Sequence, residues 1–276
     1  MAIVNTNAVK VHQPECLDDF ALQQNSRYKL ESILDQTLPF PANGVCGIVL
    51  YGLYGTGKTT IANLLPGLID TSKADPNAAN LQPSSIRDTQ EPFVDYHPCA
   101  QGQNGAQLTQ QINNRTQLIS LNASGYHFVV MDEVDNLTEA AQAGFKAIMG
   151  KHHVVFIMTT NNLDKIDAGI QNRSVLIDMN VPPPAYWRPI LSRVYTDANL
   201  TPPTNAVLDQ VVIAGRGSAR SIFSDVVMGA NQAKRSGQPV QRIVGRSQFV
   251  TFPISALGDQ VINCLANCLF WVTSGQ

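Results

Sequence analysis

The sequence contains little charge and few cysteines, and both shortages exclude classes of protein. Charged residues make up only 14% of the 276 residues and the net charge is -2, so no overall basic surface is available to attract nucleic acid. Contact with DNA would have to come from a local patch. No two of the five cysteines form a C-x-x-C pair, which argues against a zinc site and against a disulfide framework.

Long apolar runs are also missing. None reaches the ~18 residues needed to cross a bilayer, and the N-terminus has no apolar segment typical of a signal peptide. We therefore expect no membrane contact and a cytoplasmic location. Cys264 and Cys268 lie in an apolar segment, and we expect them to be buried thiols of a reducing compartment.

The most informative stretch is a glycine-rich loop between an apolar segment and a helical one. The apolar segment, 45–51, has the composition of a strand buried on both faces. Glycines let the backbone approach phosphates closely, and the helix that follows presents its positive end to an anion. A glycine-rich turn before an ordinary helix would not need a lysine and a threonine in register, so we favour a P-loop that binds ATP. The candidate nucleotide-binding residues are Gly52, Tyr54, Gly55, Thr56, Gly57, Lys58, Thr59 and Thr60.

A pair of acids follows the next apolar strand, 127–131. Asp132, at the carboxyl end of that strand, is placed to organise Mg²⁺ together with the Thr59 hydroxyl. Glu133 is placed to polarise an attacking water, while Lys58 reaches the outer phosphates. Such a pair is often only a solvated turn. After a P-loop, it predicts the second motif of an ATPase.

A further apolar strand, 154–158, ends in polar residues. Ligands gather outside the carboxyl ends of the strands in a doubly wound sheet. Asn161 would therefore lie beside the P-loop, where it can orient the water or sense the terminal phosphate. The alternative is an asparagine that only caps a turn.

The other patterns complete an α/β core. Helices are expected at 28–34 and 137–149, and short strands at 92–96 and 175–177. The region from 101 to 119, rich in Gln and Asn, predicts a loop followed by a polar helix that runs through Ile119.

Two departures from a regular core are expected near the P-loop helix. Pro66 lacks a backbone donor and clashes with the preceding turn, so it should end or kink that helix early. Asp, Asn, Ser and Pro dominate 70–91, which predicts a long polar loop.

Composition divides the chain into three parts. A proline linker at 182–184 separates the α/β core, 1–180, from a small all-α domain at 181–235. The third part, 236–276, has no clear role, and its apolar stretch 261–272 suits one buried helix or an oligomer contact. The helical patterns of the all-α domain are 185–195, 205–213 and 218–234.

In this order the motifs resemble those of the AAA+ ATPases. They look most like the clamp-loader group, which includes the replication factor C small subunit and its phage counterparts. Segment 14–20 resembles the box that precedes the family's adenine pocket, and 132–138 resembles the clamp-loader form of the Walker B motif. Segment 161–173 is similar to the stretch from the sensor-1 asparagine to the finger arginine. Segment 217–220 is similar to the sensor-2 region of the lid.

The resemblance implies a P-loop AAA+ core with a parallel sheet flanked by helices, followed by an α-helical lid. It implies ATP and Mg²⁺ as cofactors. Arg173 would act on the nucleotide of a neighbouring subunit, because an always-charged guanidinium suits the charge of a phosphoryl group in transfer. Arg220 would reach the nucleotide of its own chain from the lid. For each arginine the alternative is a surface salt bridge.

By this resemblance the protein would be an ATP-hydrolysing motor subunit in a homo- or hetero-oligomeric ring of five or six subunits, acting on DNA and a sliding clamp. DNA contact is expected at 101–115 and at a basic cluster. Segment 101–115 is mostly amide, and the alternative for it is a polar, solvated loop and helix. One alternative is a remodeller or assembly factor that acts on a protein. Another is a nucleotide-gated scaffold without turnover. The basic cluster comprises Lys146, Lys151, His152 and His153.

Overall fold

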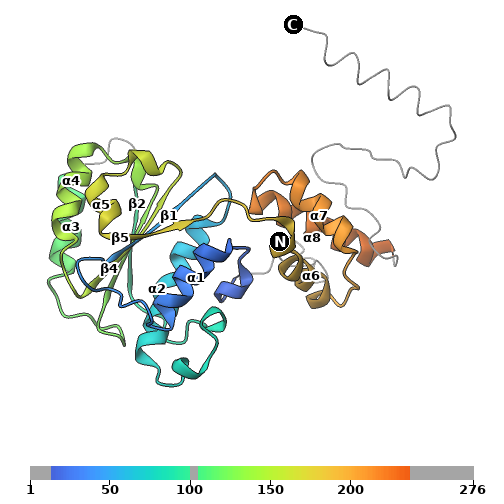
Figure 1. Cartoon of the computed structure of the whole chain (residues 1–276), viewed down its shortest axis with the longest axis horizontal. Helices are drawn as coiled ribbons and strands as arrows, with labels where there is room; N and C mark the ends of the chain where they lie inside the picture. The colour runs from blue at the N-terminus through green and yellow to red at the C-terminus, as the bar shows by residue number, and fades with distance from the viewer. Residues whose placement is uncertain (1–13, 100–104, 237–276) are drawn as a thin grey trace, which may run out of the picture. The chain divides into compact units, whose positions relative to one another are not determined.

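The centre of the protein is a five-stranded sheet in the order β2-β3-β4-β1-β5 (Figure 1). The structure is a computed structural model that describes residues 14–99 and 105–236. All four pairs of neighbouring strands are parallel. The strands are β1 Gly47–Tyr51, β2 Val94–Pro98, β3 His127–Asp132, β4 Val154–Thr160 and β5 Ser174–Asp178.

Helices cover both faces of this sheet, as a parallel sheet requires. On one face, Ile61 and Leu65 of α2 pack with Ile48 and Leu50 of β1 in one apolar cluster. On the other face, α3, α4 and α5 pack against the side chains that alternate with these, such as Val49. The helices of this part are α1 Gln24–Leu34, α2 Lys58–Ala74, α3 Gly105–Arg115, α4 Glu139–Ile148 and α5 Ala168–Asn172.

Three further helices form a separate apolar cluster after the sheet. They are α6 Arg188–Asp197, α7 Asn205–Ala214 and α8 Ala219–Ser236. Leu191 and Tyr195 of α6 pack with Leu208 of α7 and Ile222 of α8. The predicted fold class, a parallel sheet flanked by helices and followed by a small helical unit, is confirmed.

Pro66 was predicted to end or kink the P-loop helix, and the first of these outcomes is wrong. Helix α2 continues to Ala74 with Pro66 inside it. Leu65, Leu68 and Ile69 on either side of the proline are fully buried. Burial of each such side chain contributes about 1.5–3 kcal/mol, which offsets the ~3 kcal/mol that a proline costs inside a helix.

The polar loop predicted at 70–91 is also shorter than expected. Its first five residues belong to α2, and Asp70 is fully buried there. Asp70 Oδ1 accepts a hydrogen bond of 2.9 Å from the amide of Ser124, which satisfies one oxygen of the buried carboxylate. Two short 3-10 turns, Ala78–Asn80 and Pro83–Ser85, interrupt the rest of the segment.

Helix α3 ends at Arg115 and does not run through Ile119 as predicted. The hydroxyl of Thr116 donates to the carbonyl of Ile112 at 2.8 Å, and such a local bond competes with the helical pattern. The apolar stretch 261–272, with Cys264 and Cys268, lies outside the described residues. Within 14–99 and 105–236, no helix is long and apolar enough to cross a membrane.

Candidate functional site

A cavity of about 790 Å³ opens at the carboxyl ends of β1, β3 and β4 and extends to α8. It gathers residues from five predicted motifs that are far apart in the chain, and Pro14, Asp19 and Phe20 come from the predicted segment 14–20. Gly52 is not among the lining residues, and its carbonyl accepts a hydrogen bond from Lys58 Nζ. The predicted residues that line the cavity are Tyr54, Gly55, Thr56, Gly57, Lys58, Thr59, Thr60, Asp132, Glu133, Asn161 and Arg220.

The glycine loop has the backbone conformation expected of a P-loop. Gly57 has φ +94° and lies immediately before α2, a conformation that an L side chain rarely adopts. Lys58 starts the helix, and its Nζ donates to the carbonyls of Gly52 at 2.9 Å and Leu53 at 2.6 Å. Burial lowers the pKa of Lys58, although nearby carboxylates act in the opposite direction. The ammonium is therefore held inside the loop that would receive phosphates.

The carboxylate of Asp132 lies beside the hydroxyl of Thr59. Thr59 Oγ1 is 3.0 Å from Asp132 Oδ1 and 3.2 Å from Oδ2. A hydroxyl and a carboxylate are oxygen ligands of the kind that Mg²⁺ prefers, so this pair fits the predicted ion. Two further hydroxyls reach the same carboxylate, those of Thr159 and Tyr96. Sequence reasoning assigned neither to the site.

Glu133 and Asn161 lie at the ends of neighbouring strands. The Glu133 side chain is exposed to the cavity, and its Oε2 accepts from Asn136 Nδ2 at 3.2 Å. Glu133 has φ +58°, which is uncommon for a residue with a side chain. Asn161 follows β4 and is half-buried at the cavity wall. Both are placed where a water molecule next to bound phosphates could be activated.

The helical unit closes the other side of the cavity. The amide of Ala219, the first residue of α8, donates to the carbonyl of Gly55 in the P-loop at 2.8 Å. Arg220 is the next residue, and its exposed side chain lines the cavity. Trp187 and Phe223 add an aromatic wall, with ring centroids 6.1 Å apart. No motif marks these two aromatics, so sequence reasoning missed them.

Arg173 is not among the residues that line this cavity. Its backbone carbonyl accepts from the amides of Cys46 and Gly47, where β1 begins. The P-loop follows the other end of β1, and five residues at ~3.3 Å each separate the two by roughly 16 Å. The Arg173 side chain donates to the carbonyl of Gly169 at 3.0 Å. Arg173 therefore lies away from the pocket of its own chain.

The predicted DNA-contacting cations are engaged within the chain. Lys146 Nζ is 3.2 Å from Asp167 Oδ2, and Arg115 pairs with Asp95. Lys151 Nζ donates to Thr116 Oγ1 at 2.7 Å and to a backbone carbonyl. These contacts leave less positive charge for phosphate than the sequence suggests.

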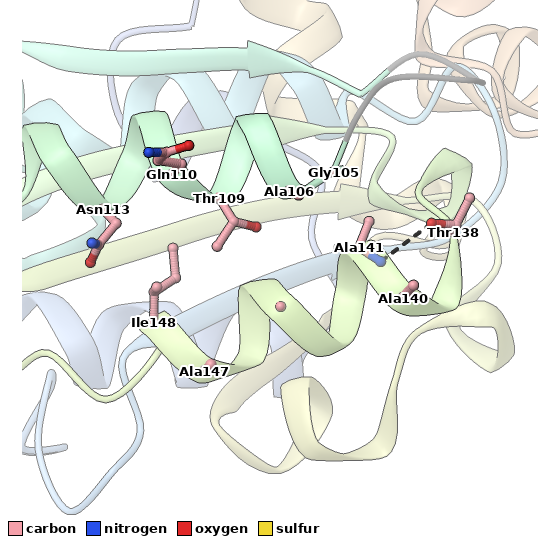
Figure 2. A pocket seen from close by; sticks show the side chains of 11 residues that line it. Gly105, Ala106, Thr109, Gln110, Asn113, Thr138, Ala140, Ala141, Ala147 and Ile148 are labelled. Carbon is pink, nitrogen blue, oxygen red and sulfur yellow. Dashed lines mark hydrogen bonds between the residues drawn. The ribbon is translucent and has the colours of Figure 1, made fainter.

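A groove of about 720 Å³ lies between α3 and α4, in the region predicted to contact DNA (Figure 2). Its walls are small and uncharged. Thr109, Gln110 and Asn113 of α3 face Ala140, Ala141 and Ala147 of α4.

Residues 48–181 match the model of one protein family, the ATPase family associated with various cellular activities (AAA). These residues form an AAA+ ATPase domain. The match includes the P-loop, both acids and Asn161, and it indicates an enzyme that binds and hydrolyses ATP. The clamp-loader group is a finer assignment than this match gives.

Solved structures of RuvB from Thermotoga maritima share the AAA+ fold of this chain. A RuvB mutant is 16% identical with a TM-score of 0.57, over 84% of this chain and 69% of that chain. The structure described as the RuvB Holliday junction branch migration motor is 15% identical with a TM-score of 0.55, over 84% and 68%. At these identities the likeness shows the fold alone. A comparison with curated proteins found no match.

Proposed function

We propose that this protein is an ATP-driven motor subunit that works in an oligomeric ring and acts on DNA. One observation carries the proposal. The cavity collects Lys58, Asp132, Glu133 and Asn161 from one chain, whereas Arg173 lies at the opposite end of β1. A ring would bring Arg173 of one subunit to the cavity of the next.

Each residue of the cavity has a role in this proposal. Lys58 and the P-loop amides hold the phosphates, and Thr59 with Asp132 would hold Mg²⁺. The ion would neutralise charge on the phosphate oxygens. Glu133 polarises the attacking water, and Asn161 orients it.

The two arginines connect the nucleotide to movements of the assembly. Arg220 contacts the nucleotide from α8, and the adjacent Ala219 is hydrogen-bonded to Gly55. Hydrolysis, which removes the terminal phosphate, would therefore change the contacts of α8 directly. Arg173 would stabilise the charge of the transition state in the neighbouring site.

DNA is the favoured substrate because of the clamp-loader form of the motifs. The shared fold with RuvB, whose structure is described as a Holliday junction branch migration motor, is compatible with this substrate class. The finer form of the proposal is a clamp-loader-like ring of five or six subunits, which closes around DNA and acts with a sliding clamp.

A protein substrate is the second candidate. It is favoured by the state of the predicted DNA-contacting cations, since Arg115, Lys146 and Lys151 all have partners inside the chain. A remodeller or assembly factor would need no basic surface.

Steady-state ATP hydrolysis with and without primer-template DNA tests the proposal, with Glu133→Gln as the blank. We expect turnover by the wild type, none above background by the blank, and stimulation by DNA. A rate of hydrolysis that is the same with and without DNA would favour the protein substrate. Absence of turnover under both conditions, with nucleotide still bound, would indicate a scaffold and contradict the motor.

A further inference from the structure

We infer that Thr159 is a positioning residue for ATP hydrolysis, which holds Asp132 and the backbone of Glu133 in their working orientation. The inference rests on the proposed function of the cavity. Thr159 lies near the end of β4, two residues before Asn161, and it is only 1% exposed. Nothing in the P-loop or acidic motifs assigns it a role.

Thr159 connects the two acidic residues through one hydroxyl group. The amide of Glu133 donates to Thr159 Oγ1 at 2.9 Å. Thr159 Oγ1 in turn lies 2.5 Å from Asp132 Oδ1. An ionised carboxylate only accepts, so the hydroxyl proton must point to Asp132, and its lone pair remains free for the Glu133 amide. Both bonds are satisfied at once in a single orientation.

The strand register makes this arrangement specific to Thr159. In the parallel pair β3 and β4, Met131 lies opposite Met158, so the next residues, Asp132 and Thr159, are also neighbours. The bond is short, as expected for a hydroxyl that donates to a charged acceptor. The hydroxyl is buried, so no bulk water can replace it.

Glu133 needs such support because its backbone is strained. A residue with a side chain at φ +58° persists only where its surroundings hold it there. The bond from Thr159 fixes its amide, and the amide of Asn136 donates to its carbonyl at 3.0 Å. Together they determine where the Glu133 carboxylate points.

The other two hydroxyls that contact Asp132 cannot hold its carboxylate in the same way. Thr59 is exposed and belongs to the proposed Mg²⁺ site, so its contact with Asp132 would change when the ion binds. Tyr96 lies on the edge strand, is 43% exposed, and reaches Asp132 Oδ2 at 3.1 Å. Among the residues that the structure describes, Thr159 alone bonds the Asp132 carboxylate from the buried side.

The decisive comparison is Thr159→Val against Thr159→Ser. Valine keeps the shape and removes the hydroxyl, whereas serine keeps the hydroxyl. Loss of a group that orients a metal ligand typically reduces metal affinity or activity about 10- to 100-fold. We expect kcat of Thr159→Val to fall by that factor while KM for ATP changes less than about threefold. Thr159→Ser should retain most of the wild-type kcat.

A second readout does not require turnover. Binding of a fluorescent ATP analogue is measured over a Mg²⁺ titration. In Thr159→Val, the Mg²⁺ concentration that gives half of the Mg²⁺-dependent binding should rise about tenfold, because Asp132 is no longer held. The Thr159→Ser titration should overlay the wild type.

Thr116→Val is the matched control. Thr116 is also a buried threonine whose hydroxyl is hydrogen-bonded within the chain, to Ile112, Asn113 and Lys151, but it lies outside the cavity. It should lose thermal stability comparable to Thr159→Val while kcat and the Mg²⁺ titration stay at wild-type values. If Thr116→Val loses as much kcat as Thr159→Val, the loss in both variants comes from reduced stability. That result would overturn the inference.

A double mutant separates the inference from the proposed function. If Thr159 acts on Mg²⁺ through Asp132, adding Thr159→Val to Asp132→Asn should change the Mg²⁺ titration little further. Wild-type values for Thr159→Val in both measurements would overturn the inference. A wild-type protein that binds Mg²⁺ and nucleotide without hydrolysis would contradict the proposed motor, and the Mg²⁺ titration would still decide the role of Thr159.

Discussion

The residue that best connects strain to chemistry in this protein is Glu133. It carries the carboxylate proposed to activate water and has φ +58°. For an L-residue this left-handed conformation costs roughly 1–2 kcal/mol. Strained residues of this kind are found where the surrounding structure holds a group for function. The bonds from Thr159 and Asn136 are that surrounding structure.

The strain can be measured by comparing Glu133→Gly with Glu133→Ala. Both variants remove the carboxylate, but glycine adopts a positive φ without a steric penalty. We expect Glu133→Gly to have a free energy of unfolding about 1 kcal/mol higher than Glu133→Ala, although glycine also loses more backbone entropy on folding. Urea denaturation measures the difference. A more stable alanine variant would show that the backbone at 133 is not strained in solution.

At the scale of elements, α3 and α4 are held together by small residues. A Cβ atom on Gly105 would lie 2.0 Å from Ala141 Cβ, far inside van der Waals contact. A Cβ atom on Gly144 would meet only Thr109 Oγ1, at 3.6 Å. Both positions line the groove between the helices, and Gly105 is labelled in Figure 2. The close approach of α3 and α4 therefore depends on glycine at 105 and not on glycine at 144.

This difference predicts opposite effects for two identical substitutions. Gly105→Ala should destabilise the protein by about 1–3 kcal/mol, because the two helices must separate. Gly144→Ala should be neutral or stabilise by up to about 1 kcal/mol, because alanine favours the helix interior. Thermal unfolding followed by circular dichroism measures both. Equal losses of stability would show that the helices do not pack as closely as described.

At the scale of the whole molecule, the position of Arg173 fits the proposed ring. It lies where β1 begins, while the P-loop follows the end of the same strand. In the proposed ring, each active site therefore contains the cavity of one subunit and Arg173 of its neighbour. Loss of Arg173 and loss of Lys58 then affect different sides of the interface.

Mixing two inactive variants tests this arrangement. Arg173→Ala should bind ATP normally and lose hydrolysis by 10³-fold or more, on the order of what a finger arginine contributes elsewhere. Lys58→Ala should bind ATP weakly. In a mixture, an Arg173→Ala cavity next to a Lys58→Ala subunit is complete, so part of the activity should return. Normal hydrolysis by Arg173→Ala alone would rule out a role in trans.

Local sequence was sufficient for the features that depend on neighbouring residues. The P-loop is a strand, a glycine turn and a helix within one short stretch, and the apolar runs of β1, β3 and β4 mark buried parallel strands. Asp132, Glu133 and Asn161 were predicted because each follows such a strand. Their roles, and the limits of the domains, stay predictions.

Only the tertiary structure decided what depends on contacts between distant residues. Pro66 stays inside α2 because its neighbours are buried, and Asp70 is buried with its Oδ1 bonded to Ser124. Thr159 meets Asp132 and Glu133 through the register of β3 and β4, which no local pattern specifies. Composition and periodicity record the preferences of a segment, whereas hydrogen bonds across strands and helices depend on where the packed core places each side chain.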